Sequence, residues 1–257
     1  MAKREKEIPA RIFQIWFGSK EPPANCRYWR NTLIEKNRRF KFHLWDEFDN
    51  RRLIETNAPW FLPTYDAYPA EIYRCDAVRY FYLYLKGGFY IDLDTECLRP
   101  LDAFLKYPGV VLGRMGVNND FAHSIPNAIM ASRDREPFWL LAIALLMERG
   151  GQSGPPELLT GPTLLKDAHD LYLSPDKARV AAYTERVTST GTMLQPRPQA
   201  SKIFMLPPHE WYPIDWSNPD HQMLRREIVF RGQMLEQWEK EAFFPHSSLV
   251  TYWSHSW

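Results

Sequence analysis

The sequence predicts an α/β protein, and three observations lead to that class. Segments typical of strands and segments typical of helices alternate along the whole chain. The length of 257 residues suits one large domain. The composition, with 45% hydrophobic and 25% charged residues, is that of a globular protein. We therefore expect a polar lead-in at residues 1–7 and a single domain over residues 8–257, without internal repeats.

The first quarter of the chain predicts two strands with helical segments after them. Residues 11–17, RIFQIWF, are β-branched and aromatic, which is typical of a buried strand. A helix is expected over 28–36. Residues 40–45, FKFHLW, alternate apolar and polar side chains and predict a second strand. Residues 46–65 are expected to form short helical pieces interrupted by prolines.

The strongest helix signal covers residues 71–86, which contain neither proline nor glycine. Gly87 and Gly88 supply the signal that ends this helix. The apolar residues 89–91 then predict a short strand.

The rest of the chain continues the alternation. A short element is expected to open at 102–105, and strands are expected at 110–113, 127–131, 203–208 and 248–253. Helices are expected at 137–149, 160–173 and 218–240, the last with Ile228, Leu235 and Trp238 on one side. This amphipathic helix packs on the core or contacts an acceptor, a partner or a membrane surface. Loops are expected at 150–156 and 184–201.

Charge and cysteine content exclude several classes. The formal net charge is +1, so no global field attracts nucleic acid. Three cysteines, at spacings that fit no zinc motif, indicate no disulfide framework. The first residues lack the apolar core of a signal peptide. The longest apolar run, 138–147, is shorter than the roughly 20 residues that a membrane span needs. We expect a cytoplasmic protein without a membrane span.

Two aspartates follow the expected strand at 89–91. In a strand, successive side chains point to opposite faces, so Asp92 and Asp94 are expected to share a face while Leu93 enters the core. Two neighbouring carboxylates raise each other's pKa unless a cation lies between them. Mg²⁺ and Mn²⁺ accept such oxygen ligands together with phosphates. The spacing therefore supports a metal–diphosphate site, although a solvated strand end gives the same pattern.

The preceding helix carries charged residues among Tyr, Phe and Leu. Asp76 and Arg79 are three residues apart and share a helical face. A surface ion pair would account for them. Their apolar surroundings indicate partial burial instead, and buried charges need partners. A sugar and a metal-bound diphosphate would supply such partners.

These residues and their spacing resemble a known signature. The string is Arg74-x-Asp76-x-x-Arg79-Tyr80, then Leu83-Tyr84, then Gly87-Gly88-x-Tyr90-x-Asp92-x-Asp94. It is similar to that of the DXD-containing sugar transferases of glycosyltransferase family 32, which include yeast mannosyltransferases and bacterial capsule enzymes. Large clostridial glucosylating toxins are more distant relatives. Further similar segments, in family order, are 8–18, 43–49, 98–104, 127–132, 159–165, 205–213 and 256–257.

The resemblance covers nearly the whole chain and implies a fold and a site. The implied fold is a GT-A-type, Rossmann-like mixed sheet flanked by helices that binds a nucleotide sugar. The implied metal ligands are Asp94 directly, Asp92 through water, and His255. The implied donor-binding residues are Trp16, which stacks on the base, Arg74, Asp76, Arg79, Asp92, Ser256 and Trp257. The implied catalytic group is Asp92, Asp94, Asp76 and Arg79.

One departure from the family pattern concerns the metal. Many relatives carry two histidines four and five residues before the terminal serine, where this chain has Thr251 and Tyr252. His255 lies nearby and either replaces them as a ligand, since imidazole binds Mn²⁺, or is a polar surface residue. His123, His209 and His246 are expected to be ordinary histidines.

The function implied by the resemblance is metal-dependent, retaining hexosyl transfer with Mn²⁺ or Mg²⁺. The donor is a UDP- or GDP-sugar, and the acceptor is a hydroxyl of a polysaccharide, a lipid-linked sugar or a protein. Peripheral membrane contact is compatible with it. The alternative is a non-catalytic sugar-nucleotide-binding or interaction protein. A haloacid dehalogenase-type phosphatase also uses Asp-x-Asp but needs Thr or Val where this chain has Glu96.

Overall fold

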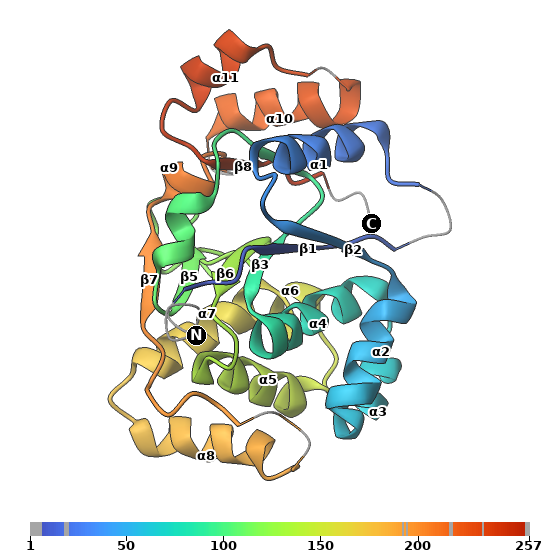
Figure 1. Ribbon diagram of the computed structural model, residues 1–257, viewed down its shortest axis with the longest axis vertical. Coiled ribbons are helices and arrows are strands. Elements are labelled where there is room, and N and C mark those ends of the chain that lie inside the picture. Colours follow the sequence, from blue (N-terminus) through green and yellow to red (C-terminus); the bar gives the residue numbers. More distant parts are fainter. Residues whose placement is uncertain are drawn as a thin grey trace.

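The structure is a computed structural model that describes residues 7–17, 21–191, 193, 195–215, 218–232 and 234–254. The predicted α/β class is confirmed. A mixed sheet crosses the middle of the molecule in Figure 1, with α1, α10 and α11 above it and α2 to α8 below it. Apolar side chains pack against both faces of this sheet.

The main sheet has six strands in the order β2-β1-β3-β6-β5-β7. They are β1 (Arg11–Ile15), β2 (Lys41–Trp45), β3 (Gly88–Ile91), β5 (Val110–Gly113), β6 (Ile129–Ser132) and β7 (Ile203–Leu206). β6 pairs antiparallel with both β3 and β5, and the remaining pairs are parallel. A two-stranded antiparallel sheet joins β4 (Thr95–Cys97) to β8 (Leu249–Thr251). The strand after the aspartates is thereby tied to the last strand of the chain.

Helices connect these strands. The α-helices are α1 (Ala24–Lys36), α2 (Glu47–Asn57), α3 (Leu62–Ala67), α4 (Glu71–Lys86), α5 (Pro137–Arg149), α6 (Pro156–Leu159), α7 (Pro162–Leu173), α8 (Lys177–Thr188), α9 (Pro208–Trp211), α10 (Pro219–Arg231) and α11 (Gln237–Phe243). The described residues also form the 3₁₀ segments η2 (Pro59–Phe61) and η3 (Asp102–Lys106). Within the described ranges, none of these helices has the length and apolar character that crossing a membrane requires.

Helix α4 is the central helix of the core and has the limits that the sequence predicts. Eleven consecutive residues, from Cys75 to Leu85, are buried. Gly87 ends the helix with a φ of 62°, a left-handed conformation that favours glycine. A Cβ on Gly87 would lie 2.5 Å from the backbone nitrogen of Asp134. The charged residues in the middle of α4 are consequently enclosed by protein.

Three predictions about the later elements are wrong. The expected loop at 184–201 begins as helix, because Asp176 caps α8 by accepting a hydrogen bond from the backbone N–H of Arg179 and the helix continues to Thr188. The cap of α7 is Gly161 rather than Thr160. The expected helix at 218–240 is two helices, as the next paragraph describes.

Gly232 divides the segment at 218–240. It ends α10 in the left-handed conformation, with a φ of 66°. A capping box between Glu236 and Glu239 then begins α11. Ile228 and Leu235 are buried as expected, but Trp238 is 69% exposed. A single amphipathic stripe is therefore not present.

Candidate functional site

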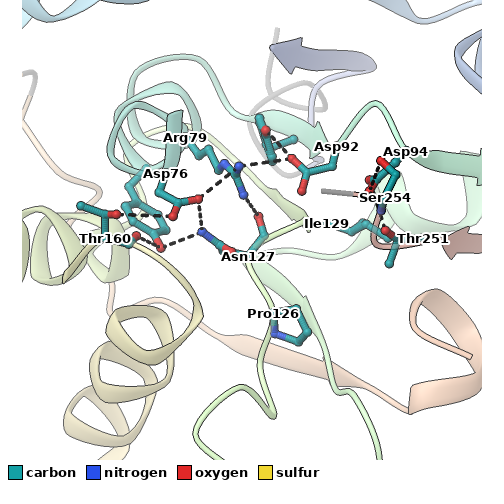
Figure 2. Close-up of polar contacts among 12 residues, drawn as sticks. Asp76, Arg79, Asp92, Asp94, Pro126, Asn127, Ile129, Thr160, Thr251 and Ser254 are labelled. Atoms are coloured by element: carbon teal, nitrogen blue, oxygen red, sulfur yellow. Dashed lines mark hydrogen bonds and ion pairs between the residues drawn. The ribbon is translucent and has the colours of Figure 1, made fainter. Parts of the chain in front are cut away.

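A cavity of about 110 Å³ opens where β3 ends, and we call it the acidic pocket. Its polar lining residues are Asp76, Arg79, Asp92, His123, Asn127 and Glu157. Its apolar lining residues are Ile72, Met115, Pro126, Ala128, Pro156, Pro162 and Trp253. Figure 2 shows how α4, the end of β3 and the segment before β6 bring the charged residues together.

Arg79 is the link between α4 and the aspartates. Its Nη2 lies 3.1 Å from Oδ1 of Asp76 and 3.3 Å from Oδ1 of Asp92 (Figure 2). Its Nη1 donates a hydrogen bond of 3.0 Å to the carbonyl of Asn127. Asp76 and Arg79 are only 4% and 3% exposed. This pair is therefore buried, as its apolar surroundings predict, and is not a surface ion pair.

Asp76 is held by residues from two other segments. The amide Nδ2 of Asn127 donates to Oδ1 of Asp76 at 2.9 Å. The hydroxyl of Thr160 donates to Oδ2 at 3.4 Å, and Tyr80 on α4 donates to the carbonyl of Thr160 at 2.9 Å. Burial raises the pKa of Asp76, while Arg79 opposes that rise. The carboxylate is thus fixed in one orientation at the pocket wall.

Asp92 has the more perturbed carboxyl group. The hydroxyl of Tyr90 donates to its Oδ1 at 2.6 Å, and the Arg79 guanidinium lies over the Tyr90 ring, 4.5 Å from its centre. Burial raises the pKa of Asp92 to about 7; Arg79 opposes the shift and the charge of Asp94 adds to it. The charge of Asp94 therefore acts on Asp92, as the expected repulsion between two neighbouring carboxylates requires.

The expectation that Asp92 and Asp94 continue the strand and share one of its faces is wrong. Strand β3 ends at Ile91, and the next residues form a turn in which the backbone N–H of Thr95 donates to the carbonyl of Asp92 at 3.2 Å. Leu93 is buried, as predicted. Asp92 lines the acidic pocket, whereas the side chain of Asp94 contacts the segment that follows β8.

Both oxygens of Asp94 accept hydrogen bonds. Oδ2 accepts from the backbone N–H of Ser254 at 2.7 Å and from its hydroxyl at 3.1 Å. Oδ1 accepts from the hydroxyl of Thr251 at 3.3 Å (Figure 2). Tyr252 donates instead to Glu96 at 2.7 Å and stacks on Trp29. At the family's two histidine positions, Thr251 therefore bonds the aspartate motif and Tyr252 packs in the core.

The remaining predicted residues divide into three groups. Trp16 follows β1, and its backbone N–H donates to the carbonyl of Trp45 at 3.0 Å. Its side chain is partly buried and packs against the hydrophobic cluster that contains Leu93. Arg74 donates to the carbonyl of Tyr68 at 2.8 Å and lines a different hollow, so the structure does not bring it to the acidic pocket. The predicted roles of His255, Ser256 and Trp257 lie outside the described residues.

Sequence reasoning missed three residues at the pocket. No role is expected for Asn127, yet it contacts both Asp76 and Arg79 of α4. His123, expected to be ordinary, lines the pocket. Trp253 also lines it, with a left-handed φ of 52° that is uncommon outside glycine, and its ring stacks on Tyr212 at 5.7 Å. For Asn127 alone the sequence offers a signal, namely a polar residue just before a buried strand.

The aspartate pair fits a divalent cation. Among the described residues there is no group of three or more His, Cys, Asp and Glu side chains that could hold a metal. Mg²⁺ and Mn²⁺, however, are commonly held by one or two carboxylates together with substrate phosphates. Arg79 and Tyr90 contact Oδ1 of Asp92, and the described residues make no polar contact with its Oδ2. Asp92 and Asp94 thus offer the hard oxygen donors that such an ion prefers.

Fold and site together define an α/β protein with a buried carboxylate–guanidinium cluster beside an Asp-x-Asp turn. Residues 23–110 match the family model described as "Glycosyltransferase sugar-binding region containing DXD motif". The matched region runs from the start of α1 to the start of β5 and includes α4 and both aspartates. This region of the chain is therefore similar to the sugar-binding region of the DXD-containing glycosyltransferases.

The chain is similar to curated yeast proteins over part of their length. It is 35% identical over 155 residues to inositol phosphoceramide mannosyltransferase 2 of Schizosaccharomyces pombe, covering 57% of this chain and 45% of that protein. It is 31% identical over 156 residues to mannosyl phosphorylinositol ceramide synthase SUR1 of Saccharomyces cerevisiae, covering 58% and 40%. The chain thus spans less than half the length of these relatives.

Solved structures of toxin domains show a weaker similarity. PaToxG glycosyltransferase aligns with a TM-score of 0.48 and 16% identity over 72% of this chain and 79% of that one. The ligand-free glycosyltransferase domain of the YGT toxin aligns with a TM-score of 0.47 and 7% identity over 93% and 89%.

Proposed function

We propose that this protein is a metal-dependent, retaining glycosyltransferase of the GT-A type that moves a hexose from a nucleotide-diphosphate sugar to a hydroxyl acceptor. The observation that carries the proposal is the bridge of Arg79 between Asp76 and Asp92 at the wall of the acidic pocket. The family of the region at 23–110 supports it. We further propose one domain over residues 8–257 and a cytoplasmic location.

Asp76 and Arg79 are the proposed contacts of the donor sugar. A sugar hydroxyl both donates and accepts, so it can bond a carboxylate and a guanidinium at once. The Nε of Arg79 is buried and has no hydrogen-bond partner within the described part of the chain. An unsatisfied buried donor is unusual in a core and is typical of a site that completes its bonds with a ligand.

Asp92 and Asp94 are the proposed holders of Mn²⁺ or Mg²⁺, with His255 as a further ligand. When bound, such an ion neutralises the charge that develops on a leaving diphosphate. Asp92 reaches the pocket from the end of β3, and Ser254 and Thr251 fix the orientation of Asp94. The chain's own contribution is therefore to hold two oxygen donors beside the sugar contacts.

The rest of the donor has proposed contacts from the resemblance. Trp16 stacks on the nucleotide base, and Ser256 and Trp257 close over the diphosphate. In a retaining reaction the acceptor hydroxyl attacks on the face from which the diphosphate leaves, and a diphosphate oxygen takes the proton. This course needs no second carboxylate across the sugar ring, in contrast to most glycosidases.

Mannose is the hexose to test first, because the yeast relatives are named mannosyltransferases. Their names also give inositol phosphoceramide as the acceptor to test among lipid-linked, polysaccharide and protein hydroxyls. Lipid acceptors are compatible with peripheral membrane contact.

The test is nucleotide release from GDP-mannose, UDP-glucose, UDP-galactose and UDP-N-acetylglucosamine, with Mn²⁺, Mg²⁺ or a chelator. We expect release from one of these donors, dependent on metal, and its loss in Asp92→Asn. Donor binding without release would favour the non-catalytic sugar-nucleotide-binding protein. Hydrolysis of a generic aryl phosphate in place of the sugar donors would favour the phosphatase.

A further inference from the structure

A second hollow, of about 640 Å³, lies away from the acidic pocket, and we call it the basic hollow. Its cationic lining residues are Arg11, Arg39, Lys41, Lys86, Arg135 and Arg197. Two carboxylates, Glu7 and Asp134, also line it. The hollow thus gathers cations from β1, β2, the end of α4 and three loops, in a chain whose formal net charge is only +1.

The basic hollow and the acidic pocket lie at opposite ends of the sheet. Arg11 and Lys41 are the first residues of β1 and β2, which run parallel. β3 runs parallel to β1 and carries Asp92 just after its last residue. Four strand residues at roughly 3.3 Å each separate the two ends by about 13 Å. The hollow is therefore not part of the proposed donor site.

Two carboxylates at or beside the hollow, Asp134 and Asp102, are already paired. Asp134 bonds Arg197 at 2.5 Å and lies 3.5 Å from Arg135. Arg39 pairs with Asp102. Among the described residues, Arg11, Lys41 and Lys86 form no ion pair. With Asp102 included, six cations face three carboxylates, so an excess of three positive charges remains at the hollow.

Two of the unpaired cations are neighbours in the sheet. Arg11 and Lys41 are partners in the β1–β2 register. Like charges at neighbouring register positions repel, which costs stability. Their field also reaches His43, whose pKa is lowered first by burial and then by these two cations. An anion beside both side chains would relieve this repulsion.

Gly88 leaves room for Arg11 at the rim of the hollow. A Cβ on Gly88 would lie 2.4 Å from Cγ of Arg11 and 2.7 Å from its carbonyl oxygen, so any side chain here would displace the arginine. Gly88 has a φ of 99°, which L side chains rarely adopt. Because Gly88, the first residue of β3, has no side chain, Arg11 has room at this position.

We propose that the basic hollow binds a small polyanion that carries two or more phosphates, with Arg11, Lys41 and Lys86 as its main contacts. Lysine and arginine are the side chains that recognise phosphate, by charge and by charge-assisted hydrogen bonds. The same chemistry is offered by a free polyphosphate and by a phosphorylated lipid headgroup. Because the hollow is distant from the aspartate pair, this binding needs no divalent cation.

The first experiment is calorimetric titration with inorganic tripolyphosphate at low salt in the presence of a chelator. We expect one bound equivalent and at least about tenfold weaker binding by the double variant Lys41→Gln/Lys86→Gln. Lys36→Gln is the matched control, because Lys36 ends α1 as Lys86 ends α4 and lines a different cavity. Absence of binding, or equal binding by the double variant and by this control, would overturn the proposal.

A second variant separates this site from the donor site. Asp92→Asn should bind tripolyphosphate as the unmodified protein does, and a changed affinity would show that the probe occupies the acidic pocket, which overturns the proposal. Co-sedimentation with phosphatidylcholine vesicles, with and without a phosphorylated phosphatidylinositol, then distinguishes the sources. If vesicles with the phosphorylated lipid recruit the protein and the double lysine variant loses this recruitment, the ligand is a lipid headgroup. If the protein binds tripolyphosphate but is not recruited to the vesicles, the ligand is a free polyphosphate. Neither result depends on sugar transfer.

Discussion

The backbone N–H of Ser254 donates a hydrogen bond of 2.7 Å to Oδ2 of Asp94, which is 160 residues earlier in the chain. Arg225 bonds the carbonyls of Tyr252 and Trp253 and so holds the same segment from the side of α10. Trp253 in turn forms part of the wall of the acidic pocket. The segment after β8 is therefore fixed directly to the second aspartate of the motif.

Removing the hydroxyls that bond Asp94 should loosen that segment. We expect Thr251→Val/Ser254→Ala to lower the free energy of unfolding by about 1 to 3 kcal/mol, because a buried carboxylate loses two hydrogen bonds. Urea denaturation measures the change. Ser189→Ala is the control, since Ser189 is exposed and bonds only a helix carbonyl. An equal loss in both proteins would show that the hydroxyls contribute nothing specific.

Arg79 should be the most sensitive single position in the cluster. Arg79→Met leaves Asp76 and Asp92 buried without their cation, so we expect the free energy of unfolding to fall by about 3 to 5 kcal/mol. Adding Asp92→Asn should restore part of that stability, because one of the two uncompensated charges is then gone. Chemical denaturation measures both changes. If the effects of the two substitutions on the free energy of unfolding simply add, Arg79 and Asp92 are not coupled and the account of the bridge is wrong.

Asn127 is predicted to position Asp76 for the donor. Asn127→Ala removes the amide that donates to Asp76 at 2.9 Å, and we expect about tenfold weaker binding of the nucleotide sugar, or about 1.4 kcal/mol. Equilibrium binding of the donor measures this, with the exposed Asn119→Ala as control. Unchanged affinity in Asn127→Ala would assign the residue to the core alone.

His43 reports on the charge of the basic hollow. Its pKa is lowered by burial first and by Arg11 and Lys41 after that, so the unfolded chain binds a proton more readily than the folded one. Stability is consequently lost as the pH falls through the ordinary histidine pKa of about 6.5. Lys41→Gln should raise the His43 pKa and lessen that loss, as NMR titration of the ring can measure. An unchanged or lower value would mean that Lys41 does not act on this site.

Local signals in the sequence predicted much of the fold. Helix α4 has the predicted limits because it lacks proline and glycine and ends at Gly87. Helix α5 and strand β5 also have their predicted limits. The break at Gly232 and the cap of α8 at Asp176 were missed, because a hydrophobic pattern does not show where a single residue ends or begins a helix.

The site was predictable where its residues are close in the sequence. Asp76 and Arg79, one helical turn apart, were correctly paired. The contact of Asn127 with Asp76 spans 51 residues and depends on β6 lying beside β3, which no local pattern specifies. Arg74 shared the motif but faces another side of α4, because residues two apart on a helix do not share a face.

The most direct test of the central claim is the binding of Mn²⁺ by the aspartate pair in the presence of a nucleoside diphosphate. Titration calorimetry should show one Mn²⁺ bound by the unmodified protein and by Asp120→Asn, whose aspartate is exposed on a loop. Asp94→Asn and Asp92→Asn should each bind at least about tenfold more weakly. Equal affinity in all four proteins would contradict the assignment of the metal to Asp92 and Asp94.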